Sequence, residues 1–350
     1  MKVSREELKS LMKNKMVKAG LREDHAEMTA EVLTWSHERG YDSHGAVRVE
    51  YYSERIFKGG ITHDPKFTWK QTGPCSGIFD GDNGVGYVVA IEGMKKAIEM
   101  AKENGVAIVG MTNMSHSGSI GYYAEMAAKE DLVAITFCQS DPMAVPYGGT
   151  EPYYGTNPIS FAAPTADERR VVFDMATTVQ AWGKILSKRS KHQSIPDDWA
   201  VDEKGQPVTD PNLVNALVPI AGAKGYGLMM LVDVFSGVLL GVPFGKHVSS
   251  MYHDLSKGRE LGQMHIVIDP DRFIGKEEFK KRMSQVCDEL GEMPAAEGYG
   301  KVYYPGERAV MRRDKAYASG GLDVVDEIYE YLKSDDIHYD RYDHKNRFAD

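Results

Sequence analysis

The chain has few cysteines, more acidic than basic residues and no long uninterrupted apolar run. Its three cysteines, Cys75, Cys138 and Cys287, are too few and too scattered to predict a disulfide framework or a zinc site. The formal net charge of −9 argues against nucleic acid or an anionic membrane as a partner, because either would require a basic patch. The longest apolar stretch, residues 228–240, contains Asp233 and is too short to span a bilayer. These absences predict a reduced, cytoplasmic protein.

The composition that remains is typical of a globular α/β protein. Hydrophobic residues make up 42% of the 350, and this length allows two domains or one large domain with an excursion. The amino terminus lacks the apolar core of a signal peptide, and Ser4 with Glu7 forms a capping box that predicts a helix start. Apolar spacing predicts further helices over 22–38, 87–104, 119–129, 279–290 and 322–332, and strands over 106–111, 132–137, 171–173 and 264–268. The inward residues are expected to be Ile91, Met94, Ala97, Ile98 and Ala101 in the helix at 87–104 and Val325, Ile328 and Leu332 in the last helix. Residues 188–212 are expected to form an exposed excursion, residues 303–308 a turn, and the residues from Ser334 onward a polar, peripheral tail.

A polar loop with the sequence Asn-Met-Ser-His-Ser-Gly, residues 113–118, lies between the strand predicted at 106–111 and the helix predicted at 119–129. Such a loop places side chains at the carboxyl edge of a sheet, where ligands of α/β proteins commonly bind. Its histidine, His116, is flanked by small residues and titrates near neutrality, so it is suited to accept a proton from a hydroxyl group. The alternative interpretation is that His116 only hydrogen-bonds the turn.

A second cluster surrounds Ser43-His44-Gly45. If the chain is helical from Ala46, then His44, Arg48 and Tyr52 lie at successive i, i+4 positions on one face. A histidine, a guanidinium and a phenol aligned in this way predict a carboxylate-binding surface, because arginine suits bidentate carboxylate recognition. A solvated helix face with a capping histidine explains the same spacing.

Two more segments predict contacts with a ligand. Asp174 follows the strand at 171–173, where it is placed either to hold a sugar hydroxyl or phosphate or to cap the helix that carries Trp182. Lys224 begins a helix that is apolar nearly all round and therefore expected to be buried, and a lysine beside free backbone amides forms an anion site. The glycine-rich segment 80–86 lacks the G-x-G-x-x-G spacing of a dinucleotide loop, so we interpret it as a structural turn.

Five segments occur together and in order over essentially the whole chain. They are Ser43-His44-Gly45 with Arg48, residues 113–118, Tyr154-Gly155-Thr156-Asn157-Pro158, Asp174-Met175-Ala176-Thr177 and Lys224-Gly225-Tyr226-Gly227. Together they resemble the malate/L-lactate dehydrogenase type 2 family. The resemblance implies an NAD(P)-dependent enzyme whose cofactor fold is not the Rossmann fold, with a mixed sheet flanked by helices. It also implies a homodimer with the active site near the subunit interface.

The resemblance further implies a division of the chain and a set of roles. Residues 1–80 form a helical, substrate-side segment that packs with the C-terminal part, residues 81–245 form the NAD-binding core, and residues 246–350 complete the first domain. His116 becomes the proton acceptor, with His44, Arg48 and Tyr52 around the substrate. The residues assigned to NAD are Ser140, Asp174, Met175, Ala176, Lys224, Gly306, Glu307 and Arg308.

NAD is expected rather than NADP. An acidic residue near the adenosine ribose accepts a hydrogen bond from the 2′-hydroxyl and repels a 2′-phosphate. Asp174 and Glu307 are the candidates for this residue, although Arg308 adjoins Glu307. The expected substrate is a 2-hydroxy acid. Which one remains open within the family, where malate, lactate, sulfolactate and a keto-gulonate are among the alternatives. A non-catalytic protein that binds a small anion is the alternative outside it, although a permanent cation would serve such a protein better than His116.

Overall fold

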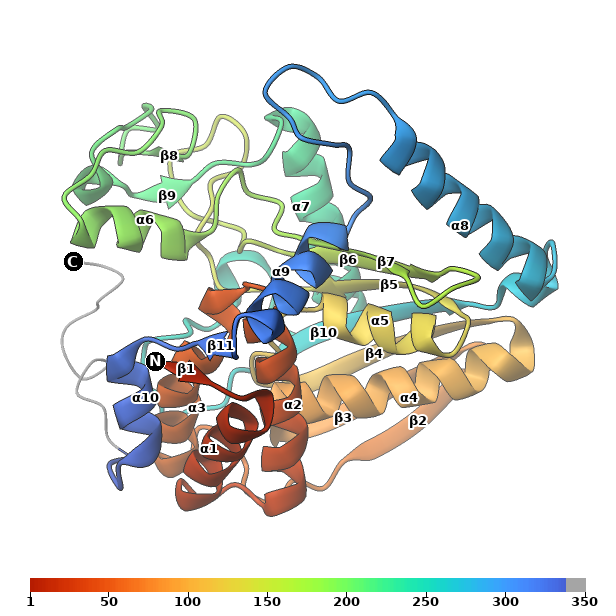
Figure 1. Cartoon of the computed structure of the whole chain (residues 1–350). Coiled ribbons are helices and arrows are strands. Elements are labelled where there is room, and N and C mark those ends of the chain that lie inside the picture. The colour runs from red at the N-terminus through yellow and green to blue at the C-terminus, as the bar shows by residue number, and fades with distance from the viewer. Residues whose placement is uncertain (338–350) are drawn as a thin grey trace.

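The computed structural model describes residues 1–337 (Figure 1). Its centre is a seven-stranded sheet in which β3 and β4 are parallel and every other neighbouring pair is antiparallel. The strands, in spatial order, are β2 (Thr68–Gly73), β3 (Ser76–Gly84), β4 (Val106–Met114), β10 (Leu261–Ile268), β5 (Val133–Cys138), β6 (Ile159–Pro164) and β7 (Arg170–Met175). The predicted mixed α/β fold is confirmed. The sheet's central strand, β10, comes from the C-terminal third of the chain.

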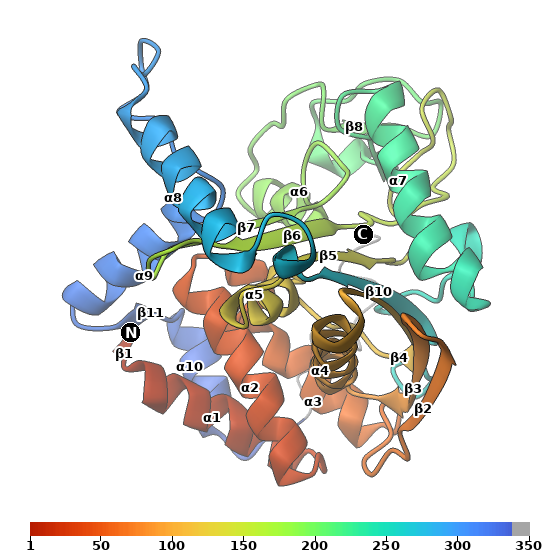
Figure 2. The same cartoon turned by 90° about the vertical axis from the view of Figure 1, so that its right-hand side faces the viewer.

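Helices cover both faces of this sheet, as Figure 2 shows. On one face lie α4 (Gly86–Asn104) and α5 (Gly121–Lys129). Of the α4 residues predicted to point inward, Ile91, Met94, Ala97 and Ala101 are buried, whereas Ile98 is only partly buried. On the other face, α7 (Ala223–Ser236) packs over β5 and β10, and α8 (Lys276–Glu292) reaches β6.

The two ends of the described chain lie side by side (Figure 1). Strand β1 (Lys2–Val3) pairs with β11 (Leu322–Asp323), and α10 (Asp326–Lys333) packs on α1 (Arg5–Lys18). Helices α2 (Glu23–Glu38), α3 (Val49–Phe57) and α9 (Glu307–Ala318) complete this helical layer. The division of the chain into the three predicted segments stays a prediction.

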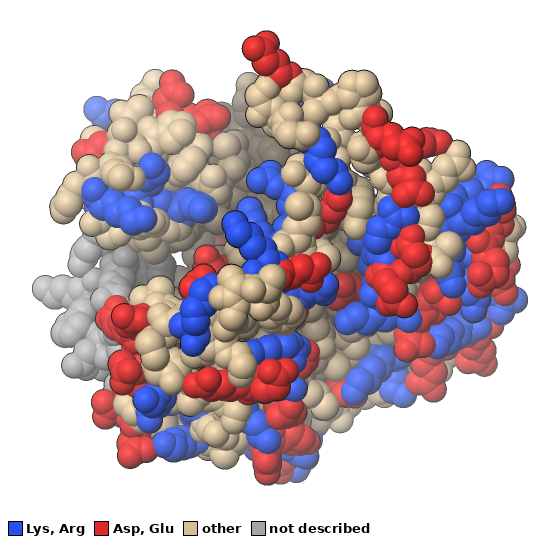
Figure 3. All heavy atoms as spheres, in the orientation of Figure 1, with Lys and Arg blue, Asp and Glu red and all other residues tan. Residues whose placement is uncertain are grey.

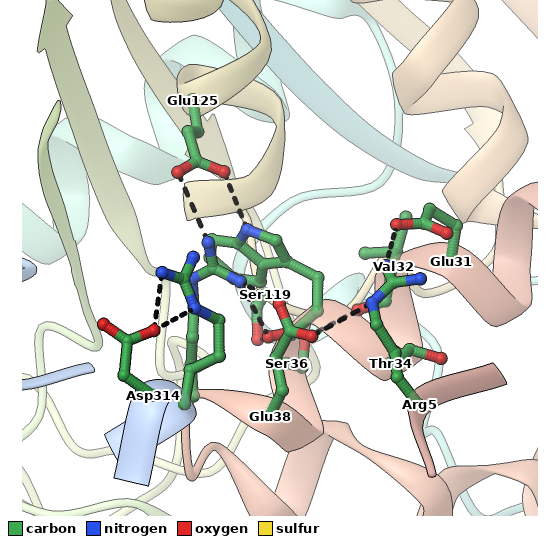
Figure 4. A network of polar contacts seen from close by, with 12 residues as sticks. Arg5, Glu31, Val32, Thr34, Ser36, Glu38, Ser119, Glu125 and Asp314 are labelled. Carbon is green, nitrogen blue, oxygen red and sulfur yellow. Dashed lines mark hydrogen bonds and ion pairs between the residues drawn. The ribbon is translucent and has the colours of Figure 1, made fainter. Parts of the chain in front are cut away.

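A buried polar network fastens the helical layer to α5 (Figure 4). The Glu125 carboxylate accepts hydrogen bonds from Trp35 Nε1 at 2.7 Å and from Arg39 Nη2 at 3.4 Å, while the Ser36 and Ser119 hydroxyls lie 3.0 Å apart. Burial opposes ionisation, but Arg39, Lys129 and the Trp35 hydrogen bond together hold the pKa of Glu125 below its ordinary value. The network therefore depends on an ionised Glu125.

A smaller lobe carries α6 (Trp182–Ser190), the short strands β8 (Ala200–Val201) and β9 (Ala216–Leu217), and a core of its own. A hollow separates this lobe from the rest of the molecule, and Lys and Arg side chains lie along the rim of the hollow (Figure 3). The segment 188–212, predicted to be an exposed excursion, belongs partly to this packed lobe, because Ile195 and Ala200 are buried in its core.

Three sequence predictions about elements are wrong. The turn expected at 303–308 is present only at Pro305 and Gly306, because Glu307 and Arg308 already belong to α9. Val325, expected on the core side of the last helix, is 68% exposed because the helix begins only at Asp326. Helix α7 is not buried all round, since Leu228, Met230, Leu231 and Val234 are each at least 37% exposed. The polar tail predicted from Ser334 lies, from residue 338 onward, outside the described residues.

The helical stretch that includes α7 also bears on the membrane prediction. By length and composition alone, Ala223–Leu240 is long and apolar enough to cross a membrane, and it is one such stretch within residues 1–337. This stretch begins five residues before the apolar run at 228–240 that was predicted to be too short. The α-helix itself ends at Ser236 and covers 14 residues, or roughly 21 Å, and the buried Asp233 accepts a hydrogen bond from the Gly245 amide.

Candidate active site

The loop that carries His116 is held from three sides. Helix α4 begins against it, and the Gly86 amide donates to the Ser115 hydroxyl at 2.8 Å. From β10, the Gln263 side-chain oxygen accepts from the Ser117 hydroxyl at 2.6 Å. From α5, the Tyr123 hydroxyl donates to the Ser117 carbonyl at 2.5 Å. These contacts fix a loop that the sequence predicted only by its position between a strand and a helix.

His116 itself is half-buried and uses one of its two ring nitrogens. Its Nδ1 lies 2.5 Å from the Tyr52 hydroxyl, and its ring stacks on that of His44 with 5.8 Å between centroids. Burial lowers the pKa of His116 well below its ordinary value, and the positive charges of Arg48 and Arg259 lower it further. The imidazole is therefore neutral at physiological pH, with Nε2 as the nitrogen left to meet a ligand.

His44, Arg48 and Tyr52 do gather beside His116, but not on one helix as predicted. Gly45 separates two short 3-10 turns, η1 (Asp42–His44) and η2 (Ala46–Arg48), and α3 starts only afterwards. The three side chains converge because the backbone bends around this glycine.

Arg48 and His44 are oriented by neighbouring groups. The Arg48 Nε donates to the Ser43 carbonyl at 2.6 Å and Nη1 donates to the Tyr252 hydroxyl at 2.9 Å, which aims the guanidinium. Burial, reinforced by Arg48, lowers the pKa of His44 to about 3, so this ring is also neutral. Tyr52 is fully buried, and its hydroxyl contacts His116 and Tyr87.

A second guanidinium, which the sequence did not indicate, lies close to His116. Arg259 is 1% exposed, and its Nη2 donates to the Ser249 carbonyl at 2.6 Å and to Asp141 at 3.3 Å. Asp141 in turn accepts from the Met251 amide at 3.0 Å. Arg259 belongs to a segment without apolar periodicity, so no sequence pattern marked it. With Arg48 and two neutral histidines, it gives the site a local positive charge within an acidic protein.

A cavity of about 460 Å3 opens beside this cluster, between η1, α6 and the end of β7. It is lined by His44 and Gly118 and by Asp174, Met175 and Ala176, so the fold brings one residue predicted to bind substrate and three predicted to bind NAD to the same cavity. The Asp174 carboxylate accepts from the Gly121 amide at 2.8 Å, so it caps α5 and not the helix of Trp182. Burial outweighs that hydrogen bond and raises the pKa of Asp174 to about 6.

Ser140 stands just behind this cavity. Its hydroxyl lies 3.2 Å from that of Thr156, which lines the cavity, and its amide donates to the Asn157 side chain at 3.3 Å. A Cβ on Gly155 would come within 2.1 Å of the Ser140 hydroxyl, so the glycine allows the two segments to approach.

A second cavity, of about 220 Å3, continues toward α9, and Tyr41 lines both. Gly306 lies in its wall with φ of +93°, where a Cβ would meet the Val172 carbonyl oxygen at 2.9 Å. Glu307 instead pairs with Lys301 at 2.5 Å, and Arg308 lies over the Tyr303 ring.

Three of the residues assigned to NAD thus stand apart from the two cavities. Glu307, Arg308 and Lys224 line neither of them, and Lys224 is exposed at the start of α7.

The sequence profile of the family described as Malate/L-lactate dehydrogenase matches residues 3–333. The chain is 54% identical over 349 residues to the ureidoglycolate dehydrogenase (NAD(+)) of Escherichia coli strain K12, with 100% of both chains covered. It is 36% identical to the malate dehydrogenase of Pyrococcus horikoshii, with 95% of each chain covered.

Solved structures agree with these sequence relatives. The sulfolactate dehydrogenase of Methanocaldococcus jannaschii superimposes with a TM-score of 0.88 at 34% identity, over 95% of this chain and 96% of that one. The malate dehydrogenase of Entamoeba histolytica superimposes with a TM-score of 0.89 at 28% identity. The whole architecture, lobe included, is therefore shared with these enzymes.

Proposed function

The chain belongs to the malate/L-lactate dehydrogenase family, and from this membership we propose that it oxidises the 2-hydroxy acid (S)-ureidoglycolate to oxalurate with NAD. One observation carries the chemistry: His116 is neutral, is held through Nδ1 by the Tyr52 hydroxyl, and lies within the electrostatic influence of the Arg48 guanidinium. A neutral imidazole is a proton acceptor but a weak anion ligand. The site therefore favours catalysis over the alternative of a non-catalytic anion-binding protein.

Each residue has a chemical task in this reaction. Arg48 pairs with the substrate carboxylate, and Arg259 adds positive charge behind it. His116 Nε2 accepts the hydroxyl proton, a role that typically contributes about 10²–10⁴-fold to the rate. NAD, when bound, accepts the hydride from the same carbon. The low pKa of His116 suits a base that has to be unprotonated before the substrate arrives.

The residues present fit NAD. The two cavities share Tyr41 in their walls and together offer room for a dinucleotide, and Gly306 keeps part of the second wall free of a side chain. Met175 and Ala176 supply apolar walls and Asp174 supplies a hydrogen-bonding group, while Ser140 stays a predicted contact behind the wall, next to Thr156. Lys224, Glu307 and Arg308 stay as predicted contacts, and Lys301 partly offsets the charge by which Glu307 would repel a 2′-phosphate.

Ureidoglycolate is preferred over the family's other substrates for two reasons. The 54% identity over the full length exceeds the 36% to the malate dehydrogenase of Pyrococcus horikoshii. In addition, the segments 47–52, 138–143 and 249–252, which resemble ureidoglycolate dehydrogenases, are those that surround Arg48 and Asp141 in the structure. This substrate would place the enzyme in allantoin breakdown in the cytoplasm.

The test is NADH formation from NAD with a panel of ureidoglycolate, malate, lactate and sulfolactate. We expect ureidoglycolate to give the highest kcat/KM, and NAD to exceed NADP by tenfold or more, which corresponds to about 1.4 kcal/mol. His116→Asn should lower turnover by about two to four orders of magnitude with little change in NAD binding. A higher kcat/KM for malate, or a His116→Asn variant with more than about a tenth of normal turnover, would contradict the proposal.

We also propose a homodimer, formed through the sheet face that carries α7. Five apolar residues stand in direct cross-strand register on that face: Ile108, Ile266, Ile135, Phe161 and Phe173. At 39% and 36% exposure, Ile108 and Phe161 are left partly uncovered. The exposed apolar side of α7 continues this surface, and an apolar surface of this kind marks an interface.

Light scattering coupled to gel filtration tests the dimer. Met230→Glu, in the exposed side of α7, should convert the protein to monomers, because it introduces a charge into the buried centre of the contact. Val17→Glu is the matched control, since Val17 is a comparably exposed apolar residue on α1, on the opposite side of the sheet (Figure 2). A monomeric parent protein, or equal effects of the two substitutions, would refute the proposed interface.

A further inference from the structure

We propose that a third cavity, of about 190 Å3, is the subsite that takes the ureido group of the substrate and selects it over a second acidic group. The proposal rests on the proposed function, in which His116 and Arg48 hold a 2-hydroxy acid. The residues of the cavity wall on which the argument depends are Asp141, Trp182, Asn215, Ser250 and Tyr252.

The third cavity adjoins both the carboxylate clamp and the larger cavity of about 460 Å3. The Tyr252 hydroxyl, which belongs to its wall, accepts a hydrogen bond from Arg48 Nη1 at 2.9 Å. At the start of α6, Trp182 lines the third cavity, whereas its neighbours in the chain, Ala181 and Gly183, line the larger one. The third cavity therefore lies beside the group that binds the substrate carboxylate.

The carbinol carbon of a 2-hydroxy acid carries four substituents, and three of them already have a place. The carboxylate pairs with Arg48, the hydroxyl group faces His116, and the hydrogen leaves as hydride toward the larger cavity. The fourth substituent needs space next to Arg48 that the other three do not use, and the third cavity offers it. Its volume equals that of roughly six water molecules at about 30 Å3 each, so a ureido group fits.

The charges in this wall favour a neutral substituent over an anionic one. Among the described residues that line the third cavity there is no lysine or arginine, and the histidine, His253, is exposed to solvent. The acid, Asp141, is already paired with Arg259 at 3.3 Å. The second carboxylate of malate, or the sulfonate of sulfolactate, would lose water here without gaining a cation and would face Asp141. An uncharged ureido group avoids both costs.

Asn215 and Ser250 supply the hydrogen bonds that a ureido group requires. Asn215 Nδ2 donates to the Thr150 carbonyl at 2.9 Å, which orients the amide and leaves Oδ1 to accept from a ureido N–H. The Ser250 hydroxyl accepts from the Tyr252 amide at 3.2 Å and keeps its own proton to donate to the ureido carbonyl. Because Asn215 Oδ1 would attract an N–H but repel a carboxylate oxygen, we assign the specificity to this residue.

Asn215→Leu tests the subsite, with Asn212→Leu as the matched control. We expect kcat/KM for ureidoglycolate to fall about 10- to 100-fold in Asn215→Leu, while the affinity for NADH, measured by fluorescence titration, changes less than about threefold. Asn212 belongs to the same lobe but does not line the cavity, and its side chain bonds Asp210. Its replacement should change neither quantity.

A binding measurement gives a second readout that needs no turnover. N-carbamoylglycine carries the carboxylate and the ureido group without the hydroxyl group, and succinate has a second carboxylate in place of the ureido group. In calorimetric titrations of the protein saturated with NADH, N-carbamoylglycine should bind at least about tenfold more tightly than succinate. Asn215→Leu should remove most of this difference, and Ser250→Ala should reduce it in the same direction.

Failure of the subsite can be distinguished from failure of the proposed function. If Asn215→Leu and Ser250→Ala both keep the preference for N-carbamoylglycine and the parent's kcat/KM for ureidoglycolate, the subsite is overturned while the reaction stands. If the parent protein oxidises malate more efficiently than ureidoglycolate and binds succinate more tightly than N-carbamoylglycine, the proposed function is overturned and the subsite with it.

Discussion

Replacing Gly86 with alanine should damage both stability and turnover, because the start of α4 touches the backbone of the His116 loop. An added Cβ would come within 2.1 Å of the Ser115 carbonyl oxygen and 2.6 Å of that of His116. Neither atom belongs to a flexible side chain, so the helix start or the loop has to move by roughly 1 Å. Overpacking of this kind costs about 1–3 kcal/mol, and a shift of about 1 Å in a catalytic group lowers turnover about 10²-fold.

The assay is a thermal melt together with steady-state kinetics on ureidoglycolate. Gly291→Ala in α8 is the matched control, because a Cβ there meets nothing within 4 Å. That substitution should stabilise the protein by about 0.5–1 kcal/mol, as alanine does in a helix, and leave turnover unchanged. A Gly86→Ala variant with a normal melting temperature and turnover within twofold of the parent would refute the packing argument.

Three other variants test single interactions. Arg48→Lys should raise KM by about 10- to 100-fold with a smaller effect on kcat, since lysine keeps the charge but loses the two-pronged contact; an unchanged KM would remove Arg48 from the site. Glu125→Gln should cost about 1.5–3 kcal/mol in denaturant unfolding at pH 7, and because the pKa of Glu125 is depressed, the difference from the parent should shrink as pH falls below about 4. Asp174→Asn should stabilise the protein by on the order of 1 kcal/mol above pH 6, because there the buried carboxyl is ionised and its burial lowers the free energy of unfolding. This gain should fade as the pH falls through about 6 toward 4, because the carboxyl then becomes protonated.

Local pattern was enough to predict much of the fold. The 3.6-residue spacing of apolar residues in α4 and the short apolar runs of the strands reflect which side chains are buried. This pattern can be recognised from the order of residues alone. The structure accordingly places Met94 and Ala97 inward and β4 directly before His116. The whole of α9 was missed because it follows a Pro-Gly pair and carries many charged residues, so it shows no clear apolar stripe. The opposite error was made for α7, whose apolar residues predicted burial on all sides although several of them, Leu228 and Met230 included, are exposed in the structure.

The sequence by itself determined the kinds of group in the site: a histidine in a loop between strand and helix, an arginine four residues after another histidine, and an acid after an edge strand. Tertiary structure decided what these groups do. It made Tyr52 the partner of His116 Nδ1, brought Arg259 behind the site, and made Asp174 the cap of α5. It also left Lys224 on the surface, away from both cavities. The physical reason is that proton position, pKa and charge pairing depend on distances of a few ångströms between residues far apart in the chain. The spacing of apolar residues along the chain does not specify these distances.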